Sequence, residues 1–288
     1  DEKLREVASI PEVKMFEIKL SQGAKPGKGG ILPAEKVSAQ IARIRGIEEG
    51  KASISPNRHP ELNSIGDILD MLDHIRGVTG KPVGLKTVIG AYGWLDEMFD
   101  EVRRRGEASA PDFITVDGGD GGTGAAPMPL MDNVGLPLRE ALPMLVDARD
   151  RAGLSKRVRI VASGKLITPA ECAWAFCAGA DFVTSARGFM FALGCIQAMK
   201  CNKNTCPTGI TTHDLRLQRG LVPGEKAVHV KNFVEKLRYG VGVIAHSCGV
   251  PHPRGLHRMH VRIVQQDGRS VALDELFPPQ QGPLADAA

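Results

Sequence analysis

Short apolar segments recur along the chain, and polar or amphipathic stretches separate them. Each segment is mostly uncharged and rich in β-branched or aromatic residues, which is the pattern of strands buried on both faces of a parallel sheet. Six such segments are present: Val13–Leu20, Ala52–Ser55, Val83–Val88, Phe113–Val116, Val158–Ala162 and Phe182–Thr184. We therefore expect each of them to form a buried parallel strand.

Helix-like stretches lie between these segments, and two of them carry clear start signals. Ser64–Asp67 resembles a capping box, and the apolar positions that follow it keep a helical spacing as far as Gly77, the expected stop. Thr168–Glu171 repeats the start signal with proline at the first helical position, and Gly179 is expected to end that helix. The chain therefore alternates strands and helices.

Alternation of this kind predicts an α/β protein, as either a doubly wound sheet or a TIM (β/α)8 barrel. The candidate functional loops all follow the carboxyl ends of successive strands, which favours the catalytic face of a barrel. Since such a barrel needs eight strands, we expect one that lacks its first two strands in this chain. We assign residues 1–265 to this N-terminally incomplete barrel domain and residues 266–288 to a C-terminal tail that includes the proline-rich stretch 278–283.

Composition and charge narrow the possible partners. The 288 residues are 42% hydrophobic and 24% charged, as in ordinary globular proteins. The 37 basic and 33 acidic side chains are spread along the chain, so no basic patch indicates nucleic acid, whereas small anions fit the net charge of +4. No apolar run approaches the roughly 18 residues of a membrane span, and the first residues lack the apolar core of a signal peptide. We expect a cytoplasmic protein without a membrane partner.

A glycine-rich motif follows the predicted strand Phe113–Val116. Residues 117–124 read D-G-G-D-G-G-T-G and contain a formal G-x-G-x-x-G, but Pro127 and Pro129 argue against the helix that a dinucleotide fingerprint requires. Glycine lets backbone pass close to a flat ring, because it has no Cβ to clash. We favour this ligand interpretation over a simple long turn, with Gly118, Gly119, Gly121, Gly122 and Thr123 as the candidate contacts.

Two further loops occupy equivalent places after the last two predicted strands. The first contains Ser163, Gly164 and Lys165, and the second contains Ala186, Arg187 and Gly188. In a barrel, the loops after the last two strands form the usual phosphate site, with backbone amides and a nearby cation. Either loop alone is also explained by turn geometry, but the pair predicts a phosphate site.

Three lysines stand out by position. Lys86 lies inside an otherwise apolar strand, where an unpaired ammonium is costly, so we expect an anionic group to meet it. The alternative is a lysine that reaches solvent at the end of the strand. Lys25 and Lys28 lie in a glycine-rich loop suited to a substrate carboxylate, although spacing alone fits a solvated surface loop nearly as well.

Three of the six cysteines gather in one loop as C-x5-C-x4-C, followed by Pro207. Thiolates collected in a short loop hold iron–sulfur clusters. Buried structural thiols, or a zinc site completed by His213, are the competing interpretations, but zinc sites usually have shorter spacings. We therefore favour iron–sulfur ligation in the segment 195–206, by Cys195, Cys201 and Cys206. Reduced thiols also fit better than a disulfide framework.

Taken in order, four motifs resemble the synthase domain of glutamate synthase, and most closely its stand-alone FMN-binding group. The motifs are Gly23–Gly27, Ile54–Pro56 with His59, Gly121–Ala125, and Cys195–Cys206 with Pro207. The resemblance covers roughly residues 13–212. It implies a TIM-barrel flavoprotein that binds FMN and a [3Fe-4S] cluster, with [4Fe-4S] as the alternative. It also implies reduction of an iminoglutarate formed from 2-oxoglutarate and ammonia.

The resemblance also implies roles for individual residues. Cys195, Cys201 and Cys206 would ligate the cluster. Lys86 would face the N1/O2 edge of the flavin, and Lys25 would bind the substrate carboxylate, which makes these two lysines the candidate catalytic residues. The other expected cofactor contacts are Ser55, Gly118, Gly119, Gly121, Gly122, Thr123, Ser163, Gly164, Lys165, Ala186, Arg187 and Gly188.

Departures from the family pattern define the alternatives. Lys28 and Ile31 stand where the main glutamate synthases place Glu and Gln, so a related FMN barrel that acts on another keto or imino acid is the first alternative. The chain opens with Asp1 and lacks a glutaminase module, so we expect ammonia from a separate glutaminase or another source. A reductase or ferredoxin would donate electrons, and the chain could form a homo-oligomer. A non-catalytic cluster-bearing fragment is the second alternative.

Overall fold

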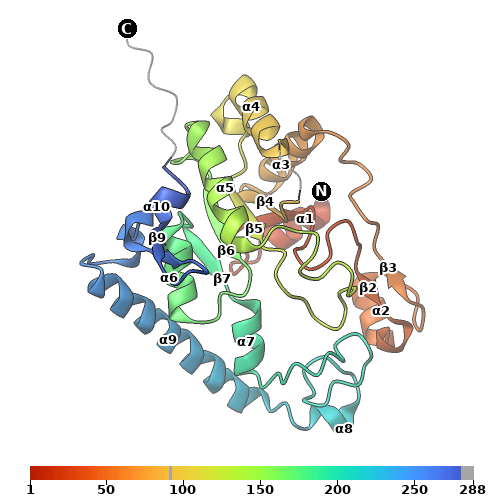
Figure 1. The fold of residues 1–288 in the computed structure, drawn as a ribbon. Coiled ribbons are helices and arrows are strands. Elements are labelled where there is room, and N and C mark those ends of the chain that lie inside the picture. Colours follow the sequence, from red (N-terminus) through yellow and green to blue (C-terminus); the bar gives the residue numbers. More distant parts are fainter. Residues whose placement is uncertain (91–92, 280–288) are drawn as a thin grey trace.

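The computed structural model describes residues 1–90 and 93–279, with a parallel sheet at its centre (Figure 1). The five strands occur in the order β1 (Phe16–Lys19), β4 (Val83–Thr87), β5 (Phe113–Asp117), β6 (Arg159–Ser163) and β7 (Phe182–Thr184). Every neighbouring pair is parallel. Among the described residues, β1 and β7 have no outer neighbour, so the sheet is open and forms no closed barrel.

One predicted strand does not join this sheet. The segment Ala52–Ser55 contains β3 (Ser53–Ile54), which pairs antiparallel with β2 (Ile31–Leu32) in a separate ribbon. The Ile54 side chain is 72% exposed, so its apolar character does not reflect burial. The expectation of six parallel strands was therefore wrong. The described sheet has five strands, and an eight-stranded barrel would need three more.

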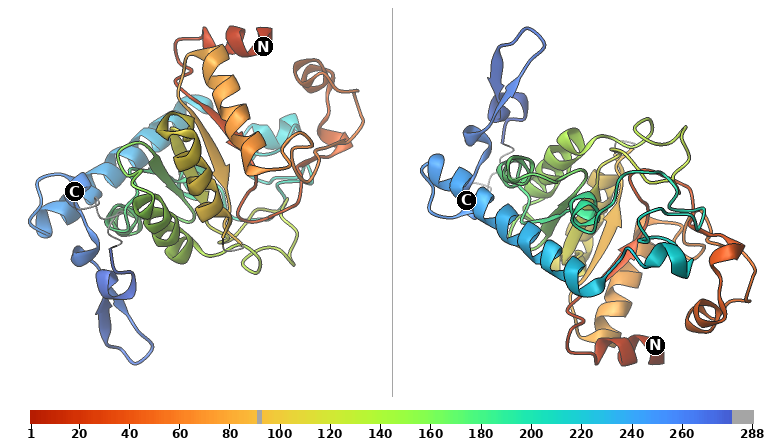
Figure 2. Two further views of the ribbon diagram at one scale, coloured as in Figure 1. Left: turned by 90° about the horizontal axis from the view of Figure 1, so that it is seen from above. Right: turned by 90° about the horizontal axis from the view of Figure 1, so that it is seen from below.

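Helices cover one face of the sheet (Figure 2). They are α3 (Ile65–Thr79), α4 (Trp94–Arg105), α5 (Leu138–Arg151) and α6 (Pro169–Cys177). The core lies between this helical layer and the alternate strand residues that point toward it, including Leu85, Ile114 and Ile160, all fully buried. Burial of such side chains is the main stabilising contribution to the fold.

The opposite face of the sheet is polar. The strand register places the side chains of Glu17, Lys19, Lys86, Thr115, Asp117 and Ser163 on this face. The Thr115 hydroxyl donates a hydrogen bond to Glu17 at 2.6 Å. The sequence predicted strands with two apolar faces. The face covered by helices is apolar, but the opposite face carries these polar side chains.

The predicted helix starts are confirmed, and one predicted stop is wrong. Ser64 and Asp67 form the expected capping box of α3, and Thr168 and Glu171 form that of α6. Helix α3 continues through Gly77 and ends at Gly80, whose φ of 64° is left-handed. Glycine is tolerated inside a helix at a cost of about 1 kcal/mol, whereas the left-handed position that ends α3 specifically favours glycine.

Charged groups tie together the amino-terminal ends of the strands, opposite the functional loops. Asp112 accepts hydrogen bonds from the Val83 amide at 2.7 Å, Arg76 Nε at 3.1 Å and Arg157 Nη1 at 2.8 Å. Partial burial alone would raise the pKa of Asp112, but the Val83 amide and the Arg76 and Arg157 guanidinium groups lower it. This end of the sheet is suited to stability rather than to catalysis.

The remaining elements lie outside the sheet and its main helical layer. Before β5 in the chain are α1 (Glu2–Ala8), η1 (Ala34–Lys36), α2 (Ala39–Arg45) and η2 (Glu107–Ser109). After β7 follow α7 (Ala186–Ala192), α8 (Leu215–Gln218), α9 (Pro223–Ser247), η3 (Pro253–Gly255), η4 (Arg258–His260), β8 (Arg262–Val264), β9 (Ser270–Ala272) and α10 (Leu273–Leu276). The long helix α9 packs against α6 and α7 (Figure 1). None of the helices in the described ranges could span a membrane.

The carboxyl-terminal region is partly integrated into the core. Leu273 is 1% exposed, and Arg258 forms an ion pair of 2.6 Å with Asp147 of α5. Residues 266–279, which the sequence assigned to a tail, thus include β9 and α10. Most of the proline-rich stretch 278–283 lies outside the described residues.

Candidate functional site

The glycine-rich segment after β5 packs tightly against its neighbours. As expected from its prolines, no helix begins between Gly118 and Pro137, and α5 starts at Leu138. The Gly118 amide donates to the Ser163 carbonyl at 2.7 Å. A Cβ on Gly119 would lie 2.1 Å from the Gly135 carbonyl oxygen, so only glycine fits there. The backbone of this glycine loop, residues 118–124, is therefore held against β6.

Asp117 joins three parts of the site. Its carboxylate accepts hydrogen bonds from the Ser163 hydroxyl at 2.7 Å and from the Gly23 amide at 2.8 Å. Lys86 Nζ lies 3.7 Å from the same carboxylate. Asp117 was not among the predicted site residues. Its place as the last residue of a strand, directly before the glycines, is the signal that could have revealed it.

For Lys86, the sequence predicted an anionic partner inside the strand. Its side chain is 24% exposed on the polar face of the sheet, and Asp117 is the anionic group that meets it. At 3.7 Å this is an ion pair rather than a hydrogen bond. Among the described residues no hydrogen bond from the Lys86 ammonium is found, which leaves its donors available to a ligand.

The loops after β6 and β7 meet the glycine loop. Arg187 Nη2 donates to the Gly122 carbonyl at 2.6 Å, and Lys165 lies 3.4 Å from Asp132. A hydrogen bond from the Gly121 amide, together with the nearby charge of Lys165, lowers the pKa of Asp132. The structure thus brings the predicted glycine and phosphate loops together at the carboxyl edge of the sheet.

An unsatisfied hydroxyl marks the second phosphate loop. Ser185 directly precedes α7 and is 7% exposed, yet its Oγ has no hydrogen-bond partner among the described residues. Buried polar atoms normally have partners. A Cβ on Gly188 would lie 2.5 Å from this oxygen, so the glycine leaves room for it. The loop therefore has an unused polar group where an anion was predicted.

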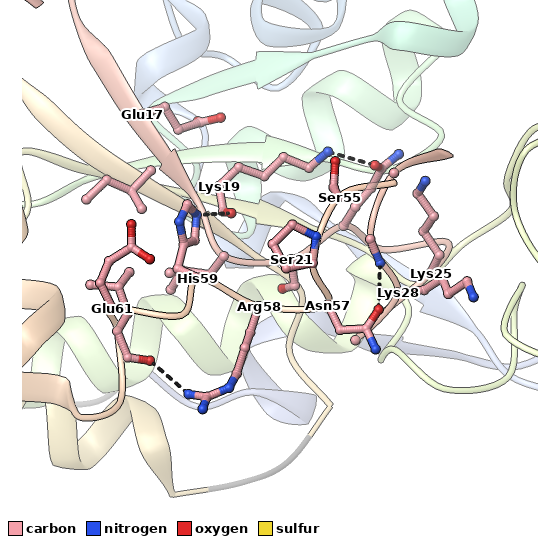
Figure 3. A pocket seen from close by; sticks show the side chains of 18 of the residues that line it. Glu17, Lys19, Ser21, Lys25, Lys28, Ser55, Asn57, Arg58, His59 and Glu61 are labelled. Carbon is pink, nitrogen blue, oxygen red and sulfur yellow. Dashed lines mark hydrogen bonds between the residues drawn. The ribbon is translucent and has the colours of Figure 1, made fainter. Parts of the chain in front are cut away.

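A pocket of about 660 Å³ lies beside the carboxyl end of β1. Figure 3 shows its side chains coming from β1, the loop 21–30 and the segment 55–62. The predicted Lys25, Lys28 and Ser55 all line it. Ser55 therefore belongs with the lysines of this pocket, where its hydroxyl lies next to Gly30.

Lys19 adds a cation that the sequence analysis did not single out. It lines the same pocket and donates to the Gln22 side chain at 2.9 Å. Burial, followed by the charges of Lys86 and Lys25, lowers the pKa of Lys19. The positive charges of Lys86 and Lys25 thus act on Lys19, and an anion bound among them would relieve this repulsion. The alternation of Glu17 and Lys19 in β1 was the available signal.

The three loop cysteines carry free thiols and are partly buried. Among the described residues, no set of three or more Cys, His, Asp or Glu side chains is arranged to hold a metal ion. Burial would raise the pKa of the Cys206 thiol, but hydrogen bonds with Thr208 and the Thr211 amide lower it to about 6. Cys206 thus has an environment that favours the thiolate, and the described residues of the loop have no preformed metal geometry.

The cysteine loop, residues 195–212, contacts the glycine loop and contains two unsatisfied polar atoms. A Cβ on Gly124 would lie 2.4 Å from the Met199 carbonyl oxygen and 3.1 Å from the Cys201 amide nitrogen. Arg187 also donates to Gln197 at 3.2 Å. The side-chain oxygens of Asn202 and Thr211 are shielded from solvent and have no partner among the described residues.

Together these features define a class of protein. It is an α/β protein whose predicted ligand-binding loops gather at the carboxyl ends of parallel strands, the usual place for a site in such folds. Residues 6–251 match the family model described as the conserved region in glutamate synthase. The chain belongs to the glutamate synthase family.

Curated relatives support this assignment. The chain is 42% identical over 276 residues to the glutamate synthase large subunit-like protein YerD of Bacillus subtilis, covering 96% of this chain and 52% of YerD. It is 33% identical over 262 residues to the archaeal glutamate synthase [NADPH] of Methanocaldococcus jannaschii, covering 90% of this chain and 49% of the relative. The chain thus spans about half the length of these relatives.

A solved structure supports the fold. A flavocytochrome b2 mutant with pyruvate bound matches 89% of this chain and 49% of its own chain, with a TM-score of 0.51 and 16% identity. At that identity the similarity concerns the arrangement of strands and helices alone.

Proposed function

We propose that the chain carries the synthase site of an FMN- and iron–sulfur-dependent enzyme that forms L-glutamate from 2-oxoglutarate and ammonia. The carrying observation is that the glycine loop, Lys86, both phosphate loops and the cysteine loop meet at one edge of the sheet. Membership of the glutamate synthase family supports the reaction class. The first step would release water to form an imine, and two electrons with two protons would then reduce the imine to the amino acid.

The residues at this edge fit FMN. The phosphate would bind at Ser163, Gly164, Lys165, Ala186, Arg187 and Gly188, and the unpartnered Ser185 hydroxyl offers one more donor. The glycine loop, with Gly118, Gly119, Gly121, Gly122 and Thr123, would let backbone approach the ring. Lys86 would stabilise negative charge at the N1/O2 edge, a role that suits an ammonium with free donors. When bound, the flavin would supply the reducing electrons.

The cysteine loop fits an iron–sulfur cluster through its donor set. Cys195, Cys201 and Cys206 are free thiols, and the low pKa of Cys206 favours the thiolate that binds metal. The shielded oxygens of Asn202 and Thr211 lack partners in the described chain. Ligation would require the three thiols to converge, since metal sites often form together with the metal. We propose [3Fe-4S] first and [4Fe-4S] as the alternative.

The lysine pocket fits the substrate. A dicarboxylate such as 2-oxoglutarate would place a carboxylate against Lys25, and Lys19 lies close enough to share that charge. One relative is a ferredoxin-dependent glutamate synthase of Oryza sativa, and others are called NADPH enzymes. We propose a ferredoxin or a reductase as the electron donor here, and a separate glutaminase or free ammonia as the nitrogen source.

One observation favours a second candidate substrate. Lys28 lines the pocket, where it adds a cation, while Ile31 is 51% exposed in β2 and provides no hydrogen bond. A more cationic pocket would accept other keto or imino acids with additional negative charge. The same flavin chemistry would then act on a different anion.

The proposal is tested on anaerobically purified protein. Flavin released by denaturation should chromatograph as FMN, and acid-labile sulfide should accompany iron. With a reduced dye as donor, 2-oxoglutarate and ammonia should yield glutamate. FMN and iron together with turnover of another keto acid would support the second candidate. Protein that contains neither flavin nor iron, and that binds neither on reconstitution, would contradict the proposal.

A further inference from the structure

Lys36 links the cysteine loop to the lobe formed by residues 31–54, which comprises β2, η1, α2 and β3. It is the last residue of the short helix η1, which lies between β2 and α2. Its ammonium donates to the Cys201 carbonyl at 2.5 Å and to the Thr211 carbonyl at 2.6 Å. One side chain thus joins two residues of the cysteine loop, Cys201 and Thr211, that are not neighbours in the sequence.

The surrounding contacts show that this is the main attachment of the loop to η1. Asn204 donates to the Glu35 carbonyl at a marginal 3.5 Å. Within the loop, Thr212 donates to the Asn204 carbonyl at 2.5 Å, and the His213 amide donates to the Asn204 side chain at 2.7 Å. The loop therefore has its own internal bonds, and Lys36 provides the strong ones to η1, because hydrogen bonds from a charged donor are about twice as strong as neutral ones.

The charge of Lys36 is not neutralised by a carboxylate. Among the described residues it forms no ion pair, although it is only partly exposed. Its ammonium is held by the partial negative charges of two carbonyl oxygens. A cation at the backbone of Cys201 favours negative charge on atoms near it, and the effect is stronger away from bulk water.

We propose that Lys36 is a positioning residue that holds the cysteine loop closed and places a positive charge beside its thiols. The electrostatic part of this inference rests on the proposed function, in which those thiols hold an iron–sulfur cluster. Because reduction adds negative charge to such a centre, a nearby cation raises its reduction potential. The geometric part concerns the chain alone and holds with or without metal.

The test compares Lys36→Met, Lys36→Gln and Lys36→Arg with Lys51→Met, an exposed lysine of the same lobe whose side chain is 69% exposed. Hydrogen exchange of the amides from Cys201 to Thr212 is measured first, in metal-free protein. We expect exchange at least about tenfold faster in Lys36→Met, from the loss of two charge-assisted hydrogen bonds. Lys36→Arg should restore most protection, and Lys51→Met should match the wild type.

The second readout is the reduction potential of the iron centre in reconstituted protein. We expect a more negative potential in Lys36→Met and Lys36→Gln, with Lys36→Arg close to the wild type. Circular dichroism shows whether each variant folds. If Lys36→Met does not fold, the same measurements are made on Lys36→Gln, which keeps hydrogen-bond donors but lacks the charge. Unchanged exchange in Lys36→Met and Lys36→Gln would overturn the positioning role. An unchanged reduction potential would overturn the electrostatic role. Wild-type protein that binds no iron would contradict the proposed function, and hydrogen exchange would then decide the positioning role of Lys36.

Discussion

Lys86 Nζ lies 3.7 Å from the carboxylate of Asp117, on the adjacent strand of the sheet. The carboxylate is already engaged by the Ser163 hydroxyl and the Gly23 amide, both at hydrogen-bond distance. Asp117 therefore holds the lysine electrostatically without occupying its donors. This arrangement gives the ammonium an opposite charge on a partly buried face and leaves its donors free for a ligand.

Replacement of Lys86 by Met should weaken the binding of reduced flavin more than that of oxidised flavin. The ammonium stabilises negative charge, and a hydrogen bond to a charged group contributes about 1.5–3 kcal/mol. We expect a loss of roughly 10- to 100-fold in affinity for the reduced form, together with a more negative flavin potential. Anaerobic titration of FMN into the apoprotein and spectroelectrochemistry measure both.

Lys156→Met serves as the matched control, because Lys156 is exposed and precedes the amino-terminal end of β6, whereas the site loops follow the carboxyl ends of the strands. Its flavin affinity and potential should equal those of the wild type. Equal losses for both redox states in Lys86→Met would indicate that the lysine only positions the ring. No loss in either state would remove Lys86 from the flavin site.

Replacement of Lys19 or Lys25 by Met should affect substrate binding rather than flavin content. The two ammonium groups share the pocket, so each removal takes away one cation from the anion site. We expect the KM for 2-oxoglutarate to rise about 10- to 100-fold, the equivalent of one charge-assisted hydrogen bond. Steady-state kinetics with a reduced dye measure this, and the flavin absorbance of each variant provides the control. An unchanged KM in both variants would place the substrate elsewhere.

The predictable part of the fold comes from local signals. Capping boxes at Ser64 and Thr168 act over one helical turn, and both are present in the structure. Buried strands such as β5 reveal themselves by continuous apolar runs. The same signal gave a wrong prediction for the segment containing Ile54. A short apolar run does not distinguish a buried strand from an exposed two-residue strand.

The unpredicted part of the site depends on register and on long-range contacts. Asp117 meets Lys86 and Gly23 only because three separate segments converge at one sheet edge. Lys36 reaches the cysteine loop across 165 positions of the sequence. No periodicity or local spacing encodes such pairings, so the sequence predicted which loops meet at the candidate site but not which polar groups hold them together.

Substitution of Gly124 by Ala should separate the glycine loop from the cysteine loop. A Cβ at this position would lie 2.4 Å from the Met199 carbonyl oxygen, and because that neighbour is backbone, the cysteine loop would have to move. We expect the free energy of unfolding to fall by about 1–3 kcal/mol and iron retention to fall several-fold. Denaturant titration and iron analysis of reconstituted protein measure the two effects.

Gly77→Ala is the control for that substitution. Gly77 lies inside α3, and a Cβ added there would have no atom of a neighbouring element within 4 Å among the described residues. Alanine should stabilise the helix by up to about 1 kcal/mol and leave iron retention unchanged. If Gly124→Ala binds iron as well as this control does, close contact between the two loops is not required for the cysteines to act.

Replacement of Asp112 by Asn should lower stability in a pH-dependent way. The carboxylate accepts bonds from Val83, Arg76 and Arg157, and its pKa is held below the ordinary value. A depressed pKa contributes stability that is present above the unfolded pKa of about 3.9 and is lost as the pH falls through the folded pKa. At neutral pH we expect Asp112→Asn to lose roughly 1–3 kcal/mol. Urea unfolding should show this difference constant from pH 7 to about pH 4 and shrinking at lower pH, because the unfolded carboxyl then takes up a proton before the folded one does. Asp100→Asn, at a position 73% exposed, should track the wild type throughout, and a difference between Asp112→Asn and wild type that stays constant with pH would mean that packing, rather than charge, makes Asp112 important.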